Sequence, residues 1–219
     1  MKRREFLRND LLPGMTELVA EQANKFFARI FEVIEKETLK DVKYFVNKRG
    51  VDVNTKNEGG KTLLQWAIEL DKIQIVKFLI ANGAIVEGKT PLHLAVELGK
   101  VKIVKLLASW WGANVNAKDV DGKTPLHLAV ELDKNKIVRI LTYKWADVNA
   151  KDANDLTPLH LAVIRRYDDI AKFLASNGAN VCMTNELLDW STKNENMVVI
   201  DWIRHYEPSC GEDFSGQEF

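Results

Sequence analysis

The sequence predicts an all-α repeat solenoid, built from stacked helix–turn–helix units with short hairpin fingers and a helical cap at each end. The hexapeptide Thr-Pro-Leu-His-Leu-Ala occurs at 90–95, 124–129 and 157–162, and a degraded copy occupies 62–67. Successive threonines lie 28, 34 and 33 residues apart, a spacing that indicates a repeat array. A second apolar run with helical periodicity follows each copy, as at 100–107.

Each unit can be read in order from its hexapeptide. The threonine can cap a helix, and proline suits the first helical position because its missing N–H is not needed there. The second helix ends near a glycine, such as Gly83, Gly112 or Gly178. A polar turn such as Asp121-Gly122 then leads to the next hexapeptide. One unit cannot bury its own apolar face, so the units must stack on each other.

This pattern resembles the ankyrin repeat, which has the same period and hexapeptide. The resemblance implies that partner proteins bind at the fingertips and on the concave surface of the first helices. It also implies that His93, His127 and His160 hydrogen-bond to their own threonine and to the adjacent repeat. A metal site needs ligands that converge on one ion, whereas these histidines stand one repeat apart.

The repeat register divides the chain into three parts. Residues 1–23 form an N-terminal helical extension, 24–206 the repeat domain, and 207–219 an acidic tail with four acids and no base. The first and last units lack the hexapeptide, and we expect them to be capping units. The predicted units are 24–54, 55–83, 84–116, 117–149, 150–180 and 181–206.

The segment 84–89 is shorter than its equivalents in the other units. We expect the finger of that unit to be stunted or absent. The resulting notch either admits a side chain of a partner or reflects sequence drift.

Candidate partner-binding residues follow from the register. Fingertip candidates are Glu58, Gly59, Lys61, Val120, Asp121, Lys123, Ala153, Asn154 and Leu156. Candidates after the hexapeptides are Glu69, Leu70, Glu97, Leu98, Glu131, Leu132, Ile164 and Arg165. Three acid–leucine pairs would form a ladder of carboxylates beside an apolar ridge, suited to a basic amphipathic segment. In the alternative, the leucines turn inward and the acids only solvate the surface.

Aromatic residues gather near the ends of two second helices. Trp110 and Trp111 precede Gly112, and Trp145 occupies the equivalent glycine position with Tyr143 nearby. A bulky residue is strained where φ is positive, so we expect the helix before Trp145 to close differently. These aromatic side chains form either an exposed patch of the kind that marks interfaces or core filler.

The composition argues against several classes of function. The 31 basic and 31 acidic residues balance, which argues against nucleic-acid binding, and no apolar run is long enough for a membrane span. Cys182 and Cys210 form no motif, which favours a reducing compartment. Phosphate-loop, zinc-protease and serine-elbow motifs are also missing. We therefore expect no catalysis, no cofactor and no metal.

The sequence favours a non-enzymatic protein–protein interaction module, monomeric and cytoplasmic, acting as an adaptor, a competitor or an effector-type scaffold. The alternative is a structural protein that dimerises through its exposed tryptophans. The Lys-, Asn- and Ile-rich composition indicates an AT-rich genome. Small ankyrin proteins occur among the effectors of intracellular bacteria, so delivery into a host cytosol is a second expectation for location.

Overall fold

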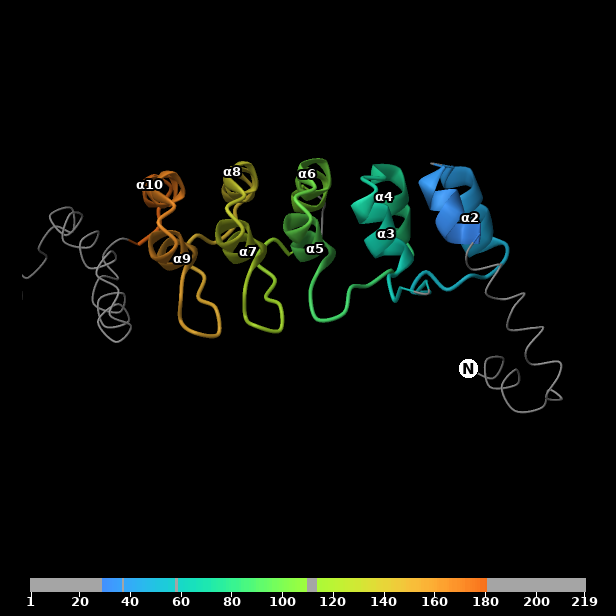
Figure 1. Ribbon diagram of the computed structural model, residues 1–219, viewed down its shortest axis with the longest axis horizontal. Coiled ribbons are helices and arrows are strands. Elements are labelled where there is room, and N and C mark those ends of the chain that lie inside the picture. The colour runs from blue at the N-terminus through green and yellow to red at the C-terminus, as the bar shows by residue number, and fades with distance from the viewer. Residues whose placement is uncertain (1–28, 37, 58, 110–113, 181–219) are drawn as a thin grey trace, which may run out of the picture. The chain divides into compact units, whose positions relative to one another are not determined.

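The computed structural model describes residues 29–36, 38–57, 59–109 and 114–180. These residues fall into two compact units that divide between Val86 and Glu87. Unit 1 contains a helical segment at 29–35, α2 (Leu39–Asn47), α3 (Leu63–Glu69) and α4 (Ile73–Ala81). Unit 2 contains α5 (Pro91–Glu97), α6 (Val101–Ala108), α7 (Pro125–Glu131), α8 (Asn135–Tyr143), α9 (Pro158–Ile164) and α10 (Asp168–Ser176) (Figure 1). The predicted array of paired helices is confirmed.

The hexapeptide begins a helix through a capping box. In α7 the side chain of Thr124 accepts a hydrogen bond from the backbone N–H of His127, and the imidazole of His127 accepts one from the backbone N–H of Thr124. The same reciprocal pair caps α5 and α9. In α3, Gln65 replaces the histidine, and its Oε1 accepts from Thr62 N–H at 2.7 Å. Each box satisfies two backbone N–H donors that the helix start would otherwise leave without partners.

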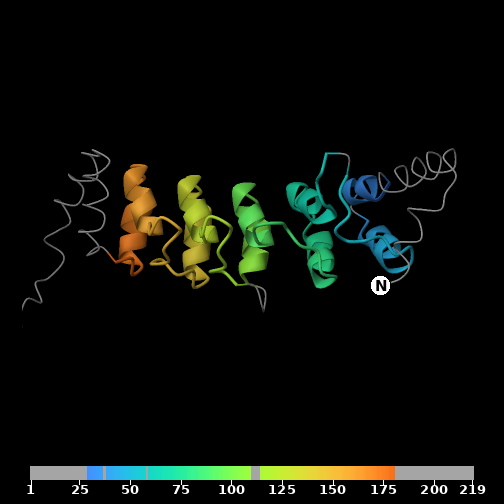
Figure 2. The same ribbon diagram turned by 90° about the horizontal axis from the view of Figure 1, so that it is seen from below.

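Packing in unit 2 follows the repeat order. The first helices α5, α7 and α9 pack side by side, each against its own second helix, and α6 packs on α8 (Figures 1 and 2). Leu126, Ile137 and Leu141 are fully buried between these helices, and α6 and α10 contribute Ile103, Ile170 and Leu174. Burying such a side chain contributes about 1.5–3 kcal/mol, so stacking supplies what one unit could not.

Unit 1 has a similar construction from less regular sequence. Its second helix was predicted within 38–47 and is found as α2, which packs on α4. Ile30, Ile34 and Val42 are fully buried, so this degenerate unit keeps an apolar core. The part of the predicted first helix before residue 29 lies outside the described residues.

Asparagine side chains join successive repeats. Asn116 Oδ1 accepts from the backbone N–H of Asp147 at 2.8 Å, and Asn149 Oδ1 accepts from Asn180 N–H at 2.7 Å. Asn54 makes the corresponding bond to Ile85 N–H at 3.0 Å within unit 1. The same asparagine bond at three junctions therefore helps to fix the register of the stack.

The expectation that the helix before Trp145 closes differently is wrong. Trp145 adopts φ +63°, the left-handed conformation that Gly83 adopts after α4. Its N–H donates to Thr142 O at 3.1 Å, and Ala146 N–H donates to Leu141 O at 3.0 Å. Gly83 and Ala84 make the same two bonds to α4. The hydrogen bonds that end the helix therefore hold the tryptophan in the conformation of a glycine.

The shortened segment 84–89 has no long finger. A turn at residues 87–88 leads directly to Thr90, with Gly88 at φ +70°. In unit 2, Gly88 O accepts from Val120 N–H at 3.2 Å, so the short turn contacts the tip of the following finger.

Candidate protein-binding surface

The fingers are rigid because one side chain closes each turn. Asp119 Oδ1 accepts from the backbone N–H groups of Asp121 at 3.0 Å and Lys123 at 2.8 Å, while Asp119 N–H donates to Lys123 O at 2.9 Å. Asp152 closes the next finger in the same way, through Asn154 and Leu156. A turn closed by a short acidic or amide side chain is a stable local structure.

The fingertips of unit 2 project into solvent, and a backbone hydrogen bond joins them. Val120 is 81% exposed, and Asp121, Ala153 and Asn154 are also exposed. Asp121 O accepts from Ala153 N–H at 3.2 Å, which joins the two fingers of unit 2. In unit 1, Gly59 and Lys61 are exposed, whereas Glu58 lies outside the described residues.

The carboxylates predicted to form a ladder are each neutralised by a lysine. Glu69 pairs with Lys61 at 2.8 Å, Glu131 with Lys123 at 2.6 Å, and Glu97 with Lys89. Each lysine stands eight residues before its glutamate, so the pair joins the end of a finger to the end of a first helix. The pKa of Lys123 is raised, chiefly by its hydrogen bond to Glu131.

The ion pair is absent from α9 and its finger. Leu156 and Ile164 occupy the positions of the lysine and the glutamate, and both are half-buried. Arg165 instead reaches back to α7, where its guanidinium lies 3.4 Å from Glu131 Oε1. The surface therefore changes from paired charges at α5 and α7 to apolar side chains at α9.

The leucines after the glutamates remain accessible. Leu98 is 37% exposed and Leu132 is 42% exposed, while Leu70 in unit 1 is half-buried. The alternative in which these leucines turn inward does not hold for Leu98 and Leu132. In unit 2 the finger-side surface therefore consists of Lys89, Glu97, Leu98, Lys123, Glu131, Leu132, Leu156, Ile164 and Arg165, together with the exposed fingertips.

His93 and His127 each bond to the next repeat, as the resemblance implied, and His160 bonds to its own Thr157. His127 is fully buried, and its Nε2–H donates to Leu156 O in the next repeat at 3.0 Å. Its Nδ1 lies 2.8 Å from Thr124 Oγ1. His93 bonds to Lys123 O in the same way. Desolvation by burial lowers the pKa of both imidazoles, so they remain neutral at neutral pH.

Part of the predicted aromatic patch can be placed. Tyr143 is 66% exposed and Trp145 is 89% exposed, near the end of α8. Trp110 and Trp111 lie outside the described residues. Sequence reasoning missed Arg139, whose guanidinium lies 4.4 Å from the ring centroid of Phe173, against which Tyr143 also packs.

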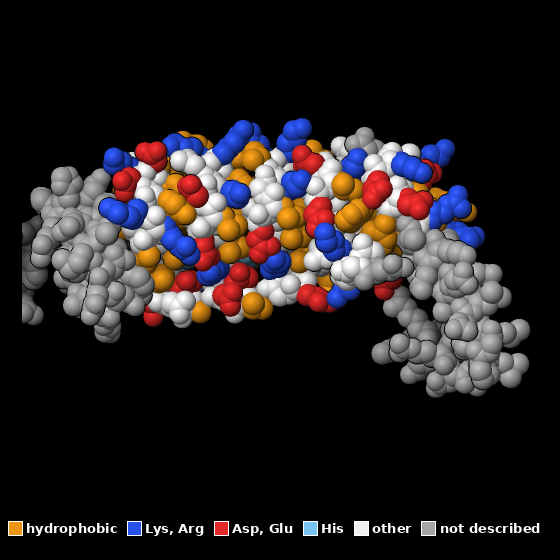
Figure 3. All heavy atoms as spheres, in the orientation of Figure 1, with side chains coloured by type: hydrophobic (Ala, Val, Ile, Leu, Met, Phe, Trp, Pro, Cys, Tyr) orange, Lys and Arg blue, Asp and Glu red, His pale blue; other side chains and the backbone are white. Residues whose placement is uncertain are grey.

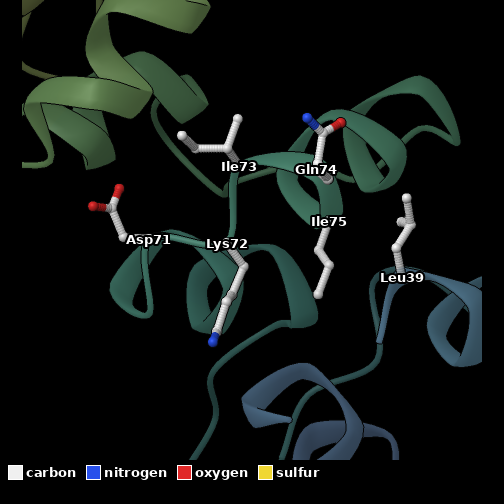
Figure 4. A pocket seen from close by; sticks show the side chains of 6 residues that line it. All are labelled: Leu39, Asp71, Lys72, Ile73, Gln74 and Ile75. Atoms are coloured by element: carbon white, nitrogen blue, oxygen red, sulfur yellow. The ribbon is translucent and has the colours of Figure 1, made fainter. Parts of the chain in front are cut away.

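One hollow in each unit can be described. In unit 1, a hollow of about 340 Å³ lies between Leu39 of α2 and the segment from Asp71 to Ile75 at the start of α4 (Figure 4). In unit 2, a polar hollow of about 570 Å³ lies at the starts of α8 and α10. Across the described ranges, no three His, Cys, Asp or Glu side chains converge as metal ligands. None of the helices in these ranges is long and apolar enough to cross a bilayer.

Comparison with known families identifies the repeat. A model of ankyrin repeats, comprising three copies, matches residues 30–119 and 112–185. No curated protein matches the chain significantly.

Proposed function

The chain belongs to the ankyrin-repeat family, and from that membership we propose that it is a non-enzymatic module that binds another protein through the finger-side surface. Ankyrin repeats are generally protein–protein interaction modules. The single observation that carries the choice of surface is the exposure of Leu98 and Leu132 beside rigid, projecting fingers. Adjacent exposed apolar side chains at equivalent positions favour a binding surface over a solvated one.

The ion pairs determine the kind of partner. Glu97 and Glu131 are already neutralised by Lys89 and Lys123, so a basic partner would have to displace those lysines. An apolar segment would displace nothing, and it would gain contact with Leu98 and Leu132. We therefore propose a partner segment with an apolar face, in place of the basic amphipathic segment suggested by the sequence.

The two ends of the finger-side surface differ, because the lysine–glutamate pairs at α5 and α7 are replaced by apolar residues at α9. The apolar area continues from Leu132 to Ile164 and Leu156, where no lysine–glutamate pair interrupts it. The largest apolar residue of the partner is expected to lie near α9. Such a complex should depend weakly on salt, because exposed charges are screened by salt whereas apolar contacts are not.

The test is affinity capture from a lysate of the source cells, followed by affinity measurement with the recovered protein. Leu98→Asp combined with Leu132→Asp should weaken binding about 100-fold or more, because each change places a charge in the apolar contact. Tyr44→Asp is the matched control, since it makes the same kind of change at an exposed apolar residue of α2 that belongs to neither proposed surface. Circular dichroism should show that all variants fold.

A charge exchange separates the two kinds of partner. Lys89→Glu combined with Glu97→Lys keeps an ion pair but reverses its polarity. The affinity should change less than about threefold if the partner contacts the exposed leucines, and should be lost if the partner binds the carboxylates. Loss of capture with Tyr44→Asp, while the double leucine variant still binds, would contradict the finger-side proposal.

The self-assembly alternative makes a different prediction. If Trp145 and Tyr143 join two copies of the chain, sedimentation should show a dimer whose population rises with concentration and falls with Trp145→Ser. We expect a monomer whose sedimentation does not change with concentration.

A further inference from the structure

A row of cations runs along the second helices of unit 2. Lys105 in α6, Arg139 in α8 and Lys172 in α10 each stand 15 residues after the threonine of their hexapeptide, and all three are exposed. We refer to these three residues as the outer row. Exposed Lys102 and Lys136 lie one turn earlier on α6 and α8. Figure 3 shows blue side chains recurring along the upper edge, over the helices labelled α6, α8 and α10 in Figure 1.

The outer row differs from the finger-side lysines in its pairing. Lys89 and Lys123 each have a glutamate partner. Within the part of the chain that the structure describes, no carboxylate forms an ion pair with Lys105, Arg139 or Lys172. A carboxylate from another molecule can therefore approach the outer row without displacing an internal partner, and charge-assisted hydrogen bonds to such groups are strong.

Arg139 is held in place for such a contact. Its Nε donates to Asn135 Oδ1 at 2.9 Å, and its guanidinium lies 4.4 Å from the centroid of the Phe173 ring. Tyr143 packs edge-on against the same ring at 6.0 Å between centroids. A guanidinium already fixed by stacking loses less conformational freedom on binding.

Trp145 adds a second, independent observation. It is 89% exposed at φ +63°. The left-handed conformation costs about 1–2 kcal/mol for a residue with a side chain, and an indole this exposed recovers little of that cost by burial. Strain retained at an exposed aromatic residue favours a functional role, and tryptophan and tyrosine are common interface anchors.

The acidic residues near the outer row restrict the kind of partner that can bind there. Asp133, Asp168 and Asp169 line the polar hollow at the starts of α8 and α10, which Lys172 also borders. An extended polyanion running along these helices would meet the three carboxylates. A short segment crossing the later turns of α8 and α10 would meet cations and aromatic rings. Because these groups suit a mixture of acidic and apolar side chains, they favour a protein segment over a nucleic acid.

We propose that the outer row, together with Tyr143 and Trp145, is a docking surface for an acidic protein segment that carries an apolar side chain beside its carboxylates. This surface lies on the second helices, away from the finger-side surface on the first helices and fingers. The protein can therefore hold two partners at once, one through apolar contact and one through charge.

The experiment uses the full chain and a fluorescent amphipathic helical peptide of glutamate and leucine as the probe. A peptide with lysine in place of each glutamate is its matched control. We expect the acidic peptide to bind at least about tenfold more tightly than the basic one, with affinity that falls as salt rises. Arg139→Glu and Lys105→Glu should each weaken binding about tenfold, and Arg139→Gln should weaken it less.

Two further variants separate this proposal from a purely structural role and from the finger-side surface. Trp145→Gly should raise the melting temperature, because strain is released, and yet weaken peptide binding. Leu98→Asp combined with Leu132→Asp should leave peptide binding unchanged, so failure of either proposal can be recognised separately. Circular dichroism must show that each variant folds. Lys105 contacts no aromatic ring among the described residues, so Lys105→Glu keeps the test valid if Arg139→Glu does not fold.

Four results would overturn the proposal. The first is equal binding of the acidic and basic peptides. The second is peptide affinity unchanged by both Lys105→Glu and Arg139→Gln. Tighter binding of duplex DNA or anionic vesicles than of the peptide would replace the protein segment with another partner. Finally, a tenfold gain in peptide affinity on removing residues 207–219 would make the acidic tail of the chain itself the occupant.

Discussion

Replacing His127 tests how the hexapeptide stabilises the stack. In the native protein, Nε2–H donates to Leu156 O at 3.0 Å, so the neutral ring has a bare Nδ1 that accepts from Thr124. His127→Ala removes both contacts and leaves a cavity at a position with no solvent exposure. His127→Gln supplies the comparison, because Gln65 caps α3 at the equivalent position and accepts from Thr62 N–H at 2.7 Å.

The expected magnitudes follow from these contacts. Leaving a buried polar group without a partner costs about 1–3 kcal/mol, and the cavity left by the ring adds to this cost. We expect His127→Ala to lower the free energy of unfolding by about 3–4 kcal/mol. His127→Gln keeps the acceptor for Thr124 N–H and most of the volume, and should cost about 1–2 kcal/mol.

Urea denaturation followed by far-UV circular dichroism measures both variants. A loss of about 3 kcal/mol should also lower the melting temperature by about 6–12 °C. An alanine variant within about 0.5 kcal/mol of the native protein would refute the role of the cross-repeat bond. A glutamine variant as unstable as the alanine variant would refute the importance of the capping acceptor.

Three further predictions concern pH and backbone conformation. Burial lowers the pKa of His93 and His127 below the ordinary value of about 6.5. As pH falls through that value, the unfolded chain therefore binds more protons than the folded chain. The stability from these two residues is full above about pH 6.5 and declines as pH falls toward the folded pKa values. Urea midpoints should therefore be lower at about pH 5 than at about pH 7, with a smaller difference when both histidines are changed to glutamine. Gly122→Ala should destabilise the protein by about 1–3 kcal/mol, because Gly122 has φ +72° and an added Cβ would lie 2.8 Å from Ala153 N; an unchanged urea midpoint would contradict this. Arg166→Gly should raise the free energy of unfolding by about 1 kcal/mol, because Arg166 holds φ +61°; calorimetry that finds a lower melting temperature would argue against that strain.

The positions of the helix starts and of the buried helix faces could be predicted from short-range sequence patterns. Threonine, proline and histidine at fixed positions predict a helix start, and the structure has a capping box at each hexapeptide. Apolar residues at helical spacing predict which faces are buried, and Ile137 and Leu141 are fully buried. These features depend on neighbours within a few residues, which is why the sequence alone reveals them.

The electrostatics of the site required the tertiary structure. A lysine and a glutamate eight residues apart, such as Lys123 and Glu131, are not neighbours on one helix. They meet only because the finger brings the lysine back to the end of the first helix. The sequence therefore predicted a ladder of three carboxylates, whereas in the structure a lysine pairs with each of Glu69, Glu97 and Glu131.

What the sequence determined by itself is the order of the paired helices and the capping of the first helices. Only the tertiary structure decided that Leu98 and Leu132 stay exposed, that Arg139 stacks on Phe173, and that Trp145 takes a glycine conformation. Helix periodicity records which residues share a face. Exposure and stacking between neighbouring repeats depend on how those faces pack together. The backbone angle at Trp145 depends on the hydrogen bonds that end α8, which hold the residue at a strained positive φ.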